Sequence, residues 1–134
     1  MAAWGITNFE NDVALKFVDD LVKHKVQFSI GDYVAFFEQK FDPEATSLDD
    51  CLGFFTVAEL LAAIQGEPAE DLPLELKDWI ESKYIKVEQS LTSQTIKVLQ
   101  LLLKDSEAKE MYSDGPYYKA WQTCQKDLLK RLKA

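Results

Sequence analysis

The sequence predicts an all-α protein: one compact helical domain over residues 1–134, a bundle of about six helices around a central apolar helix near residues 50–65. Two observations predict this class. Apolar residues recur at helical spacing along most of the chain, and the only segment that alternates as a strand would, at residues 26–30, has no convincing partner strand. Hydrophobic residues make up 47% of the 134 residues, which suits a domain that folds around a single core.

The first helix is expected from about residue 10 to Lys25, with Asn8 or Asn11 as its N-cap. Its apolar residues recur at intervals of three and four, which places them on one face of a helix. These residues are Ala14, Phe17, Val18 and Leu21.

The middle of the chain is expected to hold the core. Residues 26–30 are expected to form an extended connector, followed by a short helix that begins at Gly31 and stops before Pro43. The stretch Leu52 to Ile64 is apolar almost all the way round, and a helix of that kind lies at the centre of a domain. The possible caps before this stretch are Ser47, Asp49 and Asp50. Gly66 fits the left-handed residue that follows a helix end.

Three further helices are expected in the second half. One starts at Leu72-Pro73, one runs from about residue 90 to Lys104, and a last one follows Gly115-Pro116. Proline is favoured at the first helical position because its missing N–H would have no partner there. The sum is six helices.

Composition excludes some classes of function. The formal charge is -8, which argues against a nucleic-acid-binding or anionic-membrane surface over the whole molecule. No stretch has the length and apolar character of a membrane span, and the start lacks the features of a signal peptide, so we expect a cytoplasmic protein. Cys51 and Cys124 are expected to be small buried thiols in a reducing compartment.

No catalytic, metal or cofactor site is predicted. His24 is the only histidine, which removes most Ser-His, Cys-His and multi-histidine schemes, and its place near a helix end is typical of a polar cap or surface group. The sequence has neither a calcium-loop spacing nor an HExxH pair, and no glycine-rich nucleotide loop. We therefore expect no metal and no cofactor.

A structural or ligand cluster is predicted where the N-terminal arm meets the central helix. Two interpretations stay open: an aromatic pocket for a cation or small polar group, or an aromatic plug that anchors the arm. Glu59, an ionisable group inside an apolar helix, is either a general-acid candidate or a structural acceptor for the Trp4 indole, an arm amide, a lysine or Arg131. The cluster comprises Trp4, Gly5, Phe9, Asn11, Asp12 and Glu59.

The negative charge lies in the first half of the chain. Residues 1–67 carry 12 acidic and 4 basic side chains, whereas residues 68–134 carry 11 of each. Two acidic clusters are candidates for a face that binds a partner, for an ordinary solvated surface, or for a metal site. They comprise Asp19 and Asp20, beside Glu10 and Asp12 on the first helix, and Asp42, Glu44, Asp49 and Asp50.

The opening string Met1-Ala2-Ala3-Trp4-Gly5-Ile6-Thr7-Asn8-Phe9-Glu10-Asn11-Asp12-Val13-Ala14 resembles that of a bacterial family of unknown function, domain of unknown function 4259. The similarity continues through Ala58 to Ala63, Leu72-Pro73 and Trp79 to the tail around Trp121 and Arg131, so it covers nearly the whole chain. Ala2, Thr7 and Tyr112 depart from the family pattern. The resemblance implies a small, acidic, mostly helical bacterial protein and no particular activity.

The function expected from composition is a non-catalytic protein-binding module whose acidic half meets a basic protein partner. An immunity protein or stoichiometric inhibitor of a basic toxin is its concrete version. Two alternatives stay open. One is a small hydrolase or ligand-binding protein centred on Glu59, with Trp4, His24 or Tyr112. The other is a self-assembling structural protein that uses Trp121 and its neighbouring tyrosines, because dense Tyr and Trp are typical of interfaces.

Overall fold

The structure is a computed structural model that describes residues 5–23, 28–83 and 85–134. In these residues the chain forms seven α-helices and no strand, which confirms the all-α prediction. The helices are α1 (Asp12–Val22), α2 (Ile30–Lys40), α3 (Leu48–Ile64), α4 (Leu74–Glu81), α5 (Gln89–Lys104), α6 (Glu107–Ser113) and α7 (Tyr118–Lys133).

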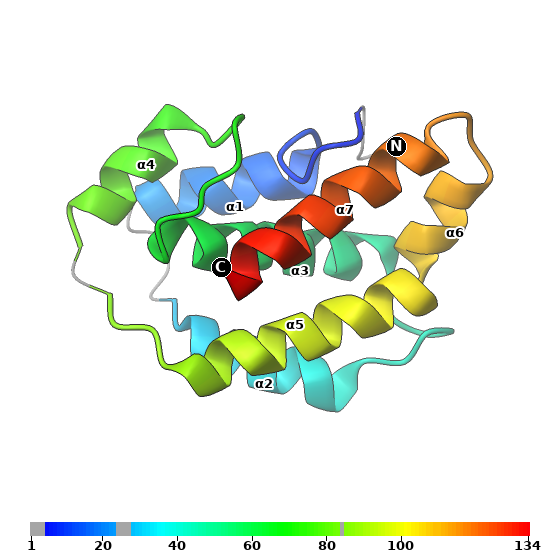
Figure 1. Ribbon diagram of the computed structural model, residues 1–134, viewed down its shortest axis with the longest axis horizontal. Coiled ribbons are helices and arrows are strands. Elements are labelled where there is room, and N and C mark those ends of the chain that lie inside the picture. The colour runs from blue at the N-terminus through cyan, green and yellow to red at the C-terminus, as the bar shows by residue number, and fades with distance from the viewer. Residues whose placement is uncertain (1–4, 24–27, 84) are drawn as a thin grey trace.

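The central helix of the prediction is α3. Its residues from Cys51 to Ala62 are buried except Gly53, and α3 contacts every other helix of the described chain. Figure 1 shows it crossing the middle of the molecule, with α1 and α7 above it, α2 and α5 below it, and α4 and α6 at opposite ends. A helix with apolar side chains on all sides is stable only when surrounded in this way.

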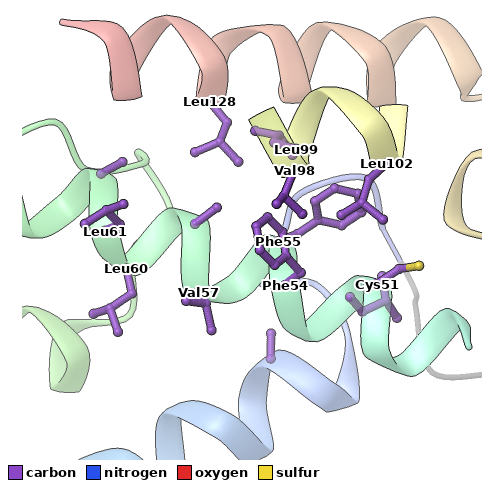
Figure 2. Close-up of a cluster of buried hydrophobic side chains, with 14 of the residues drawn as sticks. Cys51, Phe54, Phe55, Val57, Leu60, Leu61, Val98, Leu99, Leu102 and Leu128 are labelled. Atoms are coloured by element: carbon purple, nitrogen blue, oxygen red, sulfur yellow. The ribbon is translucent and has the colours of Figure 1, made fainter. Parts of the chain in front are cut away.

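The core forms where α5 and α7 meet α3. Phe55 of α3 faces Val98 and Leu99 of α5, and Leu128 of α7 approaches on the same side of α3 (Figure 2). All four side chains are fully buried. Close packing of such branched and aromatic side chains holds the helices at fixed positions.

Side-chain caps set most helix starts. Asn11, one of the two predicted caps, accepts the Ala14 N–H at 2.7 Å and begins α1. Ser47, one of the three possible caps before the central apolar stretch, accepts the Asp50 N–H at 3.1 Å, so α3 begins at Leu48. Ser29 caps α2 in the same way.

The prediction missed one helix, α6. Ser106 caps it by accepting the Lys109 N–H at 3.1 Å, and Ala108 is its only fully buried residue. A helix of two turns with one buried side chain gives a weak periodic signal. Pro116 lies one residue before the N-cap Tyr117, near the first helical position as predicted.

Candidate functional site

Glu59 lies at the centre of a buried polar cluster that joins three parts of the chain. Its side chain is 2% exposed, and Arg131 of α7 approaches it with both terminal nitrogens. Arg131 Nη1 donates to Oε1 at 2.8 Å and Nη2 donates to Oε2 at 3.2 Å. Charge-assisted hydrogen bonds in this two-point geometry are stronger than hydrogen bonds between neutral groups.

The N-terminal arm joins the cluster through Asn8, which is 4% exposed. Its side-chain amide donates to Glu59 Oε2 at 2.8 Å. It also exchanges hydrogen bonds with Gln125 of α7: Gln125 Nε2 donates to Asn8 Oδ1 at 2.7 Å, and Asn8 Nδ2 donates to Gln125 Oε1 at 3.2 Å. Every member of the cluster therefore has a partner, as buried polar groups require.

Arg131 uses the rest of its guanidinium group on neighbouring acceptors. Nε donates to Asp127 at 2.7 Å, and Nη1 also donates to the Glu67 carbonyl at 3.2 Å. Burial opposes its charge, but the hydrogen bonds and negative charges of Glu59 and Asp127 outweigh that effect and raise the pKa of Arg131. Arg131 therefore stays charged where it contacts Glu59.

Three of the other predicted members of the cluster, Asn11, Phe9 and Gly5, hold the arm in place. Asn11 Nδ2 donates to the Asn8 carbonyl at 3.2 Å while its oxygen caps α1, and Phe9 is 5% exposed in the core. The Tyr112 hydroxyl donates to the Gly5 carbonyl at 2.9 Å. Asp12 is exposed in the first turn of α1. Trp4 and His24 lie outside the described residues.

The arrangement around Glu59 is suited to holding structure. Both carboxylate oxygens accept hydrogen bonds from groups that are themselves fixed on α7 and the arm. A general acid needs a proton and access to a substrate oxygen, whereas this carboxylate is paired with a cation and covered. No group of histidine, cysteine and carboxylate side chains suited to a metal ion occurs within the described residues.

The aromatic residues near the C-terminus pack inward around Trp121. The Trp121 side chain is 1% exposed, its ring stacks with Tyr112 at 5.0 Å and with Tyr118 at 6.0 Å, and it meets Phe55 edge-on at 6.1 Å. Of the residues that suggested a self-assembling surface, Tyr117 is the one that is largely exposed, at 65%.

The two predicted acidic clusters lie at different ends of the molecule. Asp19 and Asp20 lie toward the end of α1 that is near α4, whereas the segment between α2 and α3 lies at the opposite end (Figure 1). On α1, Lys23 pairs with Asp19 at 2.8 Å and Lys16 pairs with Asp20 at 3.0 Å. The carboxylates of α1 are therefore partly neutralised by their own helix.

The second cluster has a different environment. Asp42, Glu44, Asp49 and Asp50 are all exposed, and none forms an ion pair with any described residue. Asp42 Oδ1 accepts the Glu44 backbone N–H at 2.9 Å, which orders the turn without removing charge. We call these four residues the acidic corner. Burial and then the charge of Asp50 raise the pKa of the neighbouring Tyr33 hydroxyl.

Both cysteines are free thiols. Cys51 is fully buried and Cys124 is half-buried. Burial raises the pKa of each thiol to about 11, so both are protonated near neutral pH and react poorly as nucleophiles.

Sequence reasoning missed Gln125 and considered Asn8 only as a helix cap. Gln125 lies four residues after Trp121 and three before Leu128, inside the apolar stripe of α7. An amide in such a stripe needs a buried partner, and this was the signal that could have found it. The apolar stripe does not indicate which residue pairs with Gln125, because Asn8 is 117 residues away in the sequence.

Comparison with known proteins gives a family but no function. No helix of the described chain is long and apolar enough to cross a membrane. No curated protein matches the sequence, and no solved structure matches the fold. A family model matches residues 2–124, which is most of the chain and confirms the resemblance carried by the opening string. The chain therefore belongs to the family described as a domain of unknown function (DUF4259).

Proposed function

We propose that this protein is a non-catalytic binding module of the cytoplasm that captures a basic protein partner on its acidic corner. An immunity protein or stoichiometric inhibitor of a basic toxin is the concrete form of the proposal. The observation that carries it is the state of the four corner carboxylates, which are exposed and form no ion pair with a described residue. A carboxylate that already forms an ion pair within the protein attracts a cationic partner less strongly.

Electrostatics supports a role in fast association. The first 67 residues, which include the corner, carry 12 acidic and 4 basic side chains. Charge complementarity of this kind accelerates encounter with a cationic protein and falls off as salt is added. A stoichiometric inhibitor benefits because it must reach its target before the target acts.

The rival functions have less support. A hydrolase centred on Glu59 would need that carboxylate to reach a substrate, but it is covered and held by Arg131 and Asn8. A self-assembling protein built on Trp121 would need that ring at the surface, but it is 1% exposed.

The test is a capture experiment with charge-matched variants. Immobilised protein should retain a basic protein from extracts of the source cells, in a stoichiometric complex that high salt dissolves. Asp49→Asn with Asp50→Asn should slow association at low salt about tenfold or more. The control, Asp19→Asn with Asp20→Asn, removes the same charge from α1 and should change association less. Equal loss in both pairs, or no retained basic protein, contradicts the proposal.

A further inference from the structure

An aromatic groove lies directly beside the acidic corner. It has a volume of about 250 Å³ and runs between α2 and the segment that leads to α3. Its aromatic lining comes from Tyr33, Phe36, Phe37 and Phe41, and Asp50 of the acidic corner is part of its wall. One side of this groove is therefore apolar, and its charged lining consists of Asp50 and Lys40.

The floor of the groove is fixed to the core. Phe37 packs on Phe54 of α3 with ring centroids 4.6 Å apart and stacks on Phe41 at 5.9 Å. Tyr33 stacks on both Phe37 and Phe54, at 6.2 and 6.3 Å. A surface held in this way is formed before a partner arrives, so binding does not have to order it.

Phe36 is the unusual residue of the groove. Its side chain is 63% exposed, whereas its neighbours on the same helix, Val34 and Phe37, are buried in the core. An exposed aromatic ring in a hollow with a charged rim is typical of the anchor point of a protein interface. Its burial by a partner would recover the hydrophobic free energy that the isolated protein leaves unused.

The charge around the groove selects the partner. Between Ile30 and Cys51 the chain carries six carboxylates and one lysine, Lys40, and one of the six, Glu38, pairs with Lys97 of α5 at 3.2 Å. The Lys40 ammonium lies 5.9 Å from the centre of the Phe36 ring, so the exposed ring already holds a cation on one face. The groove thus offers two things together: an apolar contact for a bulky side chain, and acceptors for positive charge.

We propose that this groove binds a basic protein segment that carries one bulky apolar side chain, which packs on Phe36 while neighbouring lysine or arginine residues pair with the acidic corner. The inference rests on the proposed function and adds the chemistry of the partner to it. The volume fits one large side chain and falls below the range of about 300–1,000 Å³ of pockets for drug-sized molecules.

The probe is a short lysine-rich peptide with a central tryptophan, compared with the same peptide carrying serine and with a glutamate-rich peptide carrying the tryptophan. Affinities are measured by fluorescence anisotropy at low salt. The basic tryptophan peptide should bind about tenfold tighter than the serine peptide, and the acidic peptide should not bind.

The variants locate the contact. Phe36→Ser should reduce the affinity for the tryptophan peptide to that of the serine peptide, and it should fold normally because the ring is exposed. Tyr117→Ser removes another exposed aromatic side chain, 65% exposed at the start of α7, and should leave binding unchanged. Lys40→Gln should tighten the binding of both basic peptides, because it removes the only positive charge of the segment.

The outcomes separate this inference from the proposed function. Suppose that both basic peptides bind with equal affinity, that both affinities fall when Asp49 and Asp50 are neutralised, and that Phe36→Ser changes neither affinity. The groove inference is then wrong, while the acidic corner keeps its proposed role. If neither basic peptide binds, the inference is also wrong, and the capture experiment decides the proposed function independently.

Discussion

The residue that does most to define this structure is a buried charge. Glu59 is 2% exposed within the most apolar helix of the chain, and removing a carboxylate from water costs several kcal/mol. Arg131 and Asn8 offset that cost by supplying three hydrogen bonds. Because these partners come from α7 and the N-terminal arm, the pair also fixes how those two parts sit on α3.

Removing the carboxylate should therefore destabilise the whole domain. We expect Glu59→Ala to lower the free energy of unfolding by about 3 kcal/mol, because Arg131 and Asn8 then lose a buried acceptor. Glu59→Gln should cost less, since an amide oxygen can still accept one hydrogen bond. Urea unfolding at neutral pH measures both.

The control for this prediction is the other carboxylate that Arg131 contacts. Asp127 is 60% exposed, so Asp127→Ala should cost less than about 1 kcal/mol. If both Glu59 variants change the stability by less than about 0.5 kcal/mol, the range of ordinary surface substitutions, the structural role assigned to Glu59 is wrong.

At this scale the sequence shows that Glu59 needs a partner side chain within the protein, but it does not show which one. A glutamate among apolar residues must be compensated, and Arg131 was one of several acceptable groups. The amides of Asn8 and Gln125 were harder to place, because their pairing depends on how α7 lies against the arm. Spacing along a helix does not contain that information.

At the scale of elements, the central helix was the easiest to predict and α6 the hardest. From Cys51 to Ala62 nearly every residue is buried, and this appears in the sequence as a continuous apolar stretch. The α6 helix has seven residues and depends on the cap at Ser106 and on contacts with α3, α5 and α7. Tertiary packing decides such short helices more than local preference does.

The end of α3 also followed from the sequence. Gly66 has φ of 94°, and the Gly66 and Glu67 amides donate to the carbonyls of Ala63 and Ala62 at 3.0 and 2.9 Å. This is the Schellman arrangement that glycine favours. It also places the Glu67 carbonyl within reach of Arg131, so the end of α3 contributes to the polar cluster.

A pair of glycine substitutions tests this helix end. Gly66→Ala should destabilise the protein by about 1 kcal/mol, because an alanine is strained at positive φ. Gly31→Ala lies inside α2, where a new Cβ would come no closer than 4.0 Å to the Ser29 hydroxyl, and it should be neutral or stabilising by up to about 1 kcal/mol. Thermal unfolding of both variants gives the comparison, and equal effects would contradict it.

Over the whole molecule, the amount of negative charge can be predicted from the sequence, but its arrangement cannot. The i,i+4 spacing of Lys16 with Asp20 and of Asp19 with Lys23 already indicates that α1 neutralises part of its own charge. In the acidic corner only Glu44 has a lysine at this spacing, Lys40, but α2 ends at Lys40 and the described residues show no ion pair between the two. Where the two clusters lie relative to each other depends on the packing of α1 and α2 around α3, which no local pattern contains.

This charge distribution predicts opposite effects of salt on stability and on binding. A net charge of -8 repels itself in the folded state. Raising NaCl from roughly 0.01 M to 1 M shortens the Debye length from about 30 Å to about 3 Å. We expect the free energy of unfolding to rise by on the order of 1 kcal/mol, or about 4 °C in Tm, while affinity for the lysine-rich tryptophan peptide falls steeply.

The variant with Asp42, Glu44, Asp49 and Asp50 all converted to their amides carries four fewer charges and should show a smaller gain in stability from salt. Stability that falls with NaCl in the unmodified protein, or a gain as large in the amide variant, would show that repulsion within the acidic half is not what salt relieves.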